Sequence, residues 1–160
     1  MGKRKIFLYK QQFLHLLHDP SKAFSVQCHP GFRTDGDLIF QIAAAAGLLA
    51  LKEVILIAGG YDKKIPYEPL SPYLCEKVSH LVLMGATGPK IEKALREYEG
   101  FCEGEPVIHH AESMEDAVAQ AEKLAKKGDI VALSPASASF DLYPNFEKRG
   151  EHFKKVVNQL

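Results

Sequence analysis

The chain has 160 residues, of which 46% are hydrophobic and 25% are charged, as expected for a single soluble globular domain. Its formal net charge is zero, which excludes the strong overall positive field by which proteins gather nucleic acid. No apolar stretch is long enough to span a bilayer, so we expect no membrane association. Residues 1–33 are locally basic, with six Lys or Arg residues against one Asp. They are interpreted as a solvated arm, although contact with anionic lipid or RNA would also fit.

The cysteines Cys28, Cys75 and Cys102 are odd in number and widely spaced, with no Cys-x-x-Cys pair. This pattern indicates reduced thiols in a cytoplasmic protein rather than a disulfide framework. The adjacent histidines His109 and His110 lack the ligand spacing of a zinc site, so no metal is expected. They are interpreted as a solvent-facing pair at a strand end, with a role in proton transfer left open. No small-residue cleavage site follows the basic start, so a signal peptide is not predicted.

Residues 1–50 form a divergent N-terminal segment whose packing the sequence does not define. Residues 37–51 are apolar and rich in alanine, which predicts a helix. The apolar residues between positions 7 and 17 fit either an amphipathic helix or a strand added to the edge of a sheet. Both alternatives stay open.

From residue 53 onward, predicted strands and helices alternate. A continuous apolar run predicts a strand buried on both faces at residues 53–58, and a second buried strand is predicted at 80–84. Shorter strands are predicted at 106–109 and 130–133. Helices are predicted for residues 71–77, from Thr87 onward, from Ser113 to a stop at Gly128, and from about Asn145 to the end. The apolar face of the last helix is predicted to contain Phe146, Phe153, Val157 and Leu160. This order predicts that residues 51–160 form an α/β domain with a Rossmann-like, mostly parallel sheet and helices on both faces.

Three loops follow predicted strands at the carboxyl-end rim of the sheet, where open α/β folds bind ligands. The lysine loop (residues 59–63) offers Lys63 as a cation for a carboxylate or phosphate. The helix-start loop (residues 85–90) offers backbone amides to an anion, and the serine turn (residues 137–140) offers hydroxyls and amides to a carboxylate. Taken singly, each loop also fits a surface lysine, a helix cap or a local turn. Their meeting at one rim favours a ligand site.

Other catalytic motifs are missing from the sequence. It contains no Gly-x-x-x-x-Gly-Lys-[Ser/Thr] loop for nucleotide phosphates and no Gly-x-Ser-x-Gly nucleophile elbow. The region around Ser134 and Ser139 has no evident His and acid partners, so a hydrolase triad is not predicted.

Three segments resemble the Mur ligase family, in the branch that adds D-glutamate to UDP-N-acetylmuramoyl-L-alanine during peptidoglycan synthesis for the cell wall. The sequence VILIAGGYDK at residues 54–63 resembles the first strand and lysine loop of the family's C-terminal domain. The sequence LVLMGATGPKI at residues 81–91 resembles the next strand and helix start, and residues 133–150 resemble the D-glutamate-binding end. Because all elements occur in order, residues 54–160 are identified as a member of this family.

The resemblance implies a chemistry and a set of binding residues. The family uses ATP and magnesium to form an acyl phosphate, which the amine of the incoming amino acid attacks to give an amide, ADP and phosphate. By resemblance, Lys63 would contact a glutamate carboxylate, and Ser139 would bind the side-chain carboxylate with its hydroxyl and amide, helped by the amide of Phe140. Phe146 would pack against the amino acid. Phe140 stands where the family often has Leu, which implies a slightly altered pocket.

The sequence also departs from the family. We find no counterpart of the UDP-sugar domain or of the central ATPase domain with its P-loop and magnesium ligands. The family's Asp-Ser-Lys-Ala-Thr-Asn segment is only echoed at residues 19–24. We therefore expect no catalytic residue, no ATP or magnesium bound by this chain alone, and weak binding of D-glutamate. The two missing domains are the candidate protein partners. Two functions fit: the D-glutamate-binding domain of the ligase, inactive alone, or a stand-alone non-catalytic binding or regulatory module derived from it.

Overall fold

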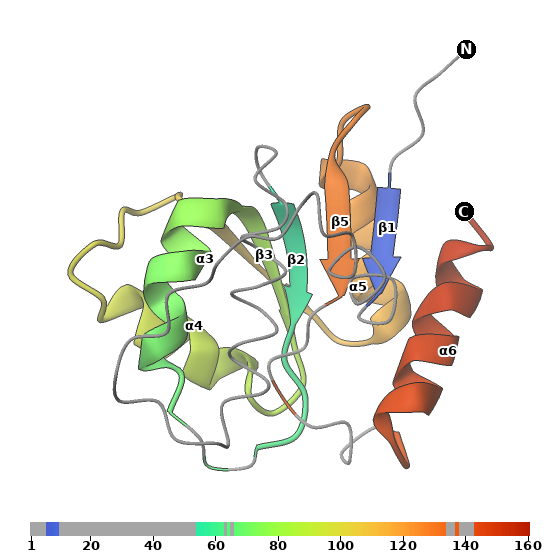
Figure 1. Ribbon diagram of the computed structural model, residues 1–160, viewed down its shortest axis with the longest axis horizontal. Helices are drawn as coiled ribbons and strands as arrows, with labels where there is room; N and C mark the ends of the chain where they lie inside the picture. The colour runs from blue at the N-terminus through green and yellow to red at the C-terminus, as the bar shows by residue number, and fades with distance from the viewer. Residues whose placement is uncertain (1–5, 10–53, 63, 65, 134–136, 138–142) are drawn as a thin grey trace, which may run out of the picture.

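A computed structural model describes residues 6–9, 54–62, 64, 66–133, 137 and 143–160 of the chain. Within these residues, five strands pair in parallel to form one sheet in the order β1-β5-β2-β3-β4 (Figure 1). The strands are β1 (Ile6–Tyr9), β2 (Val54–Ala58), β3 (Val78–Met84), β4 (Val107–Ala111) and β5 (Ile130–Leu133). The predicted α/β fold with a parallel sheet is confirmed.

The middle of the sheet is buried on both faces. All five residues of β2 are buried, and their side chains alternate between two hydrophobic cores. Leu56 lies in one core with Leu81 and Leu83, while Ile57 lies in the other with Val82. Burying a Leu or Ile side chain stabilises the fold by about 1.5–3 kcal/mol. The continuous apolar runs of the sequence therefore reflect a sheet covered on both sides.

Helices cover the two faces of the sheet. They are η2 (Glu68–Leu70, a 3-10 turn), α3 (Ser71–Lys77), α4 (Gly88–Arg96), α5 (Met114–Leu124) and α6 (Phe146–Val157). The core that contains Leu56 packs against α3 and α4, and the core that contains Ile57 packs against α5 and α6 (Figure 1). None of the helices in the described part of the chain has the length and apolar character needed to cross a membrane.

The N-terminal segment contributes an edge strand. Ile6–Tyr9 pairs with β5 in parallel, with Ile6 opposite Ile130 and Tyr9 opposite Leu133. The sequence left open whether the apolar residues near the N-terminus form a helix or an edge strand. For Ile6–Tyr9 the structure shows the edge strand. The predicted helix at residues 37–51 lies outside the described residues.

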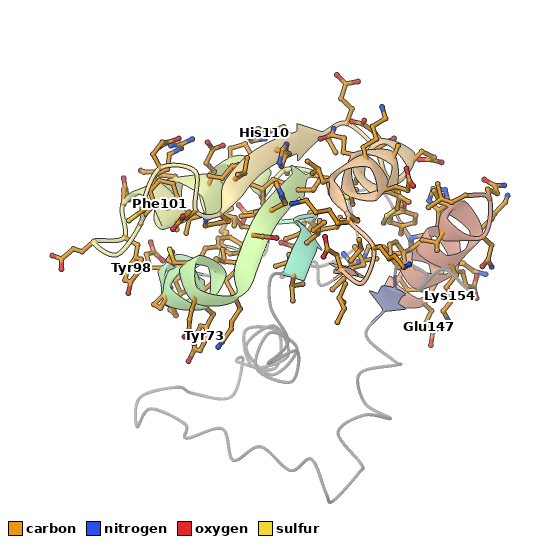
Figure 2. All side chains as sticks on the ribbon, turned by 90° about the horizontal axis from the view of Figure 1, so that it is seen from above. Tyr73, Tyr98, Phe101, His110, Glu147 and Lys154 are labelled. Atoms are coloured by element: carbon orange, nitrogen blue, oxygen red, sulfur yellow. The ribbon has the colours of Figure 1, made fainter. Side chains whose placement is uncertain are left out.

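Two helix predictions need correction. Helix α5 ends at Leu124 rather than running to Gly128, because Ala125 adopts an extended conformation and packs into the core. In α6 the buried residues are Arg149, Gly150, Phe153 and Val156, and Val157 is partly buried against the core that contains Ile57, while Leu160 is 64% exposed. The helix stops at Val157, so Leu160 no longer follows its apolar face. Figure 2 shows Glu147 and Lys154 on this helix, and both are exposed.

The interpretation of the histidine pair as solvent-facing holds for His110, which is exposed, but not for His109, which is half-buried. His109 and His110 lie inside β4, and successive strand residues point to opposite faces of the sheet. His109 contacts His80 of β3, with 3.1 Å between Nε2 and Nδ1. His110 (Figure 2) instead approaches Glu92 of α4, with 2.7 Å between Nε2 and Oε2.

Candidate functional site

The three predicted loops meet at the carboxyl ends of β2, β3 and β5. A buried group of four residues joins them, and we call it the rim cluster: Gly60, Tyr67, Thr87 and Ser137. Gly60 follows β2, Thr87 follows β3, and Ser137 comes four residues after the end of β5. Thr87 is fully buried, Ser137 is 1% exposed and Tyr67 is 5% exposed. The structure thus brings together loops that are far apart in the sequence.

Thr87 connects the helix-start loop to the lysine loop. Its Oγ1 accepts a hydrogen bond of 2.9 Å from the Gly60 amide, and its own amide donates one of 3.1 Å to the Gly60 carbonyl. Although Thr87 stands at the N-cap of α4, its side chain makes no capping hydrogen bond. The plain helix cap considered from the sequence is therefore wrong for this side chain. Its partner is instead a residue 27 positions earlier.

Ser137 connects the serine turn to the same cluster. Its Oγ lies 2.7 Å from Thr87 Oγ1 and 3.1 Å from the Tyr67 hydroxyl. A hydroxyl has one hydrogen and two acceptor lone pairs, so this chain of three hydroxyls can satisfy all its members together with the Gly60 amide. The Ser137 carbonyl also accepts a hydrogen bond of 3.1 Å from the buried Arg149 guanidinium of α6. Ser137 is thus held through both its side chain and its backbone.

An ion pair lies at the outer side of the cluster. The Asp62 carboxylate of the lysine loop accepts a hydrogen bond from Lys90 of α4 and another, 2.8 Å long, from the Lys64 amide. The hydrogen bond from Lys90, followed by that from the Lys64 amide, holds the pKa of Asp62 below its ordinary value. Asp62 therefore stays ionised at neutral pH, and it fixes the backbone on both sides of position 63.

A second hydrogen-bonded chain ties Tyr143, which lies just before α6, to helices α5 and α6. The Tyr143 hydroxyl lies 2.6 Å from His152 Nδ1, and His152 Nε2 lies 2.9 Å from Glu115 Oε1. Helix α6 starts just beyond Tyr143, where the Asn145 side chain accepts a hydrogen bond from the Lys148 amide. These contacts fix the start of α6 and the residue Tyr143 that precedes it.

The four residues predicted to bind D-glutamate are not tested by this geometry. Lys63, Ser139 and Phe140 lie outside the described residues, and Phe146 is described only as the first residue of α6. Their neighbours in sequence belong to the joined loops: Asp62 and Lys64 flank position 63, and Ser137 precedes position 139 by two residues. Sequence reasoning missed Tyr67, Thr87 and Arg149. A Thr two residues after the strand-ending Gly85 was the available signal for Thr87.

The opposite end of the sheet has different features. A cavity of about 430 Å³ lies there, lined mainly by residues 75–80 and by Gly104, Glu105 and Val107. It contains none of the predicted binding residues and none of the rim cluster. Among the described residues, no three His, Cys, Asp or Glu side chains are grouped so as to hold a metal ion. We therefore place the candidate site at the carboxyl-end rim.

Comparison with known proteins agrees with the resemblance drawn from the motifs. Residues 39–137 match the model of the family described as "Mur ligase, glutamate ligase domain". The chain is 56% identical over 118 residues to a UDP-N-acetylmuramoylalanine--D-glutamate ligase of Acetivibrio thermocellus, covering 72% of this chain and 25% of that protein. It is 56% identical over 111 residues to the protein of the same name from Clostridium botulinum strain Kyoto, covering 68% and 24%. The chain thus spans about a quarter of the length of these curated relatives. Since the family match covers most of the described sheet and helices, the chain belongs to the Mur ligase family, within its glutamate ligase domain.

Proposed function

We propose that the chain provides the D-glutamate-binding domain of an ATP-dependent ligase that joins D-glutamate to UDP-N-acetylmuramoyl-L-alanine in peptidoglycan synthesis. The observation that carries this proposal is the joining of the lysine loop and the serine turn by buried hydrogen bonds. The 56% identity to ligases named for this reaction supports the same substrate. The free thiols of Cys75 and Cys102 support a reducing, cytoplasmic location.

The proposed site has two poles for the two carboxylates of D-glutamate. Lys63 supplies a cation at one pole, and the Ser139 hydroxyl and amide with the Phe140 amide supply donors at the other. Hydrogen bonds to an ionised carboxylate are stronger than those between neutral groups, so the pairing favours a dicarboxylate. Phe146 supplies an apolar wall at the start of α6. The rim cluster supports this arrangement because it holds the residues next to both poles.

The chain by itself is proposed to bind neither ATP nor magnesium and to form no amide. Phosphoryl transfer depends on phosphates and metal being positioned together, and the 160 residues contain no P-loop motif for this task. The UDP-sugar and ATPase domains of the family are the proposed partners that supply these parts. Calorimetry with magnesium-ATP checks this, and a micromolar dissociation constant for the isolated chain would contradict it.

The test of the site is an NMR titration of the 160-residue chain with D-glutamate, with L-glutamate as the control ligand. We expect a dissociation constant of about 1 mM, equivalent to roughly 4 kcal/mol, because other walls of the pocket belong to the partner domains. The amides of Lys63, Ser139, Phe140 and Phe146 should shift, and those of residues 1–33 should not. Ser139→Ala should weaken these shifts. If all four amides stay unmoved at high concentration, the non-catalytic module becomes the better function.

A further inference from the structure

The rim cluster links two loops that are far apart in the sequence, so only contacts between distant residues can fix the distance between them. The lysine loop follows β2, and the serine turn follows β5, more than 70 residues later. Thr87 Oγ1 contacts the Gly60 amide on one side and Ser137 Oγ on the other, at 2.9 and 2.7 Å. One buried hydroxyl is therefore the shared partner of both loops.

We propose that Thr87 and Ser137 are positioning residues that hold the lysine loop and the serine turn at the separation needed by a bound dicarboxylate. This inference rests on the proposed function, because it takes D-glutamate as the ligand of Lys63 and Ser139. Lys63 follows Gly60 by three residues, and Ser139 follows Ser137 by two. The cluster thus fixes the base of each loop close to the residue that meets the ligand.

The burial of the cluster makes it more effective than the nearby ion pair. Lys90 pairs with Asp62, but its side chain is 54% exposed, and exposed ion pairs constrain a loop weakly. Thr87, by contrast, is fully buried. Loss of its hydroxyl leaves the Gly60 amide without this acceptor, so that amide must move or stay unsatisfied. Arg149 strengthens the other side by holding the Ser137 carbonyl.

A ligand with two carboxylates tests the separation of the loops directly. Its two carboxylates are joined by a chain of only three carbons, which limits how far apart they can lie, so both loops must be in place at the same time. When the loops move independently, binding must order them, and this ordering lowers affinity by about fivefold. A residue that only stabilised the fold would not produce this loss once the protein is folded.

The experiment compares the full chain with three variants, each checked for folding by circular dichroism. Thr87→Val keeps the shape and removes the hydroxyl, while Thr87→Ser keeps the hydroxyl and is the rescue variant. Ser113→Ala is the matched control, because it also removes a hydroxyl that accepts a hydrogen bond from a backbone amide, in this case at the N-cap of α5. If Thr87→Val does not fold, Ser137→Ala takes its place, since it removes the Thr87–Ser137 contact from the other side. D-glutamate affinity is measured by NMR, and protection of the Gly60 amide by hydrogen exchange without ligand.

We expect Thr87→Val to bind D-glutamate about fivefold more weakly, with Thr87→Ser and Ser113→Ala close to the unaltered chain. Equal affinity in Thr87→Val would overturn the positioning role and leave the proposed function intact. If the unaltered chain shows no response to D-glutamate, the proposed function fails, and the ligand-free measurements decide the inference. Loss of Gly60 protection together with shifts at residues 137–140 in Thr87→Val, but not in Ser113→Ala, supports the coupling of the loops. Unchanged protection and shifts refute it.

Discussion

Gly59 is the position where a single methyl group should do the most damage to the rim. Its φ of +112° is a backbone conformation that residues with a side chain rarely adopt. A Cβ there would lie 1.9 Å from the Met84 carbonyl oxygen, whereas real Cβ contacts essentially never fall below 3.0 Å. The obstacle is backbone of β3, which cannot rotate away as a flexible side chain could. Gly59→Ala must therefore separate the lysine loop from the end of β3.

Gly128 provides the matched control for this substitution. It also has a positive φ, +99°, but a Cβ there would meet nothing within 4 Å. Gly128→Ala should thus lower the free energy of unfolding only through backbone strain, by about 1–3 kcal/mol. Gly59→Ala should lose a similar amount and about 1–3 kcal/mol more from the steric conflict. Urea unfolding of both variants measures the difference, and each kcal/mol should lower Tm by about 2–4 °C for a chain of this size. Equal destabilisation of the two variants would refute the reasoning.

Three further predictions concern titration and helix capping. The lowered pKa of Asp62 means that its pairing with Lys90 stabilises the fold above the ordinary carboxyl range and that this stability is lost as pH falls through the folded pKa. Asp62→Asn should flatten the acid side of the curve of unfolding free energy against pH, and an unchanged curve would contradict this. Burial, followed by the nearby His80 and His110, lowers the pKa of His109 below its ordinary value of 6.5, so stability should also fall as pH drops below that value. His109→Gln should reduce this loss, and NMR titration of the His109 ring should show protonation below the ordinary range. Ser113→Ala should cost about 1 kcal/mol in urea unfolding by removing the cap of α5; no measurable loss would argue against the cap.

The sequence predicts the strands and helices that depend on local pattern. The run VILIA is apolar at every position because both faces of β2 are covered, and the bounds of α3 coincide with those predicted. Ser113 stands at the predicted start of α5 and caps it, since its side chain accepts a hydrogen bond from the Asp116 amide. The meeting of the three loops also follows from the sequence, because the carboxyl ends of parallel strands share one rim.

Features that depend on distant partners were not predictable in the same way. Thr87 has the local position of a helix cap, but its hydroxyl forms hydrogen bonds with the Gly60 amide and the Ser137 hydroxyl instead. Helix propensity continues past Leu124, yet Ala125 turns away because the core accepts its methyl group there. The roles of Lys63, Ser139, Phe140 and Phe146 came from resemblance to a family, and they stay predictions.

The pairing of β1 with β5 has a consequence for how the chain is assembled as it leaves the ribosome. Ile6 is synthesised before Ile130, its partner in β5, whereas β2, β3 and β4 can pair as soon as each is complete. Until β5 is made, β1 lacks this partner, and contacts of such long sequence separation form slowly. After β5 docks on β2, its outer edge stays open to other chains for as long as β1 is absent. Among the described strands, β1 is thus made before the strand on which it docks, and it covers the outer edge of β5.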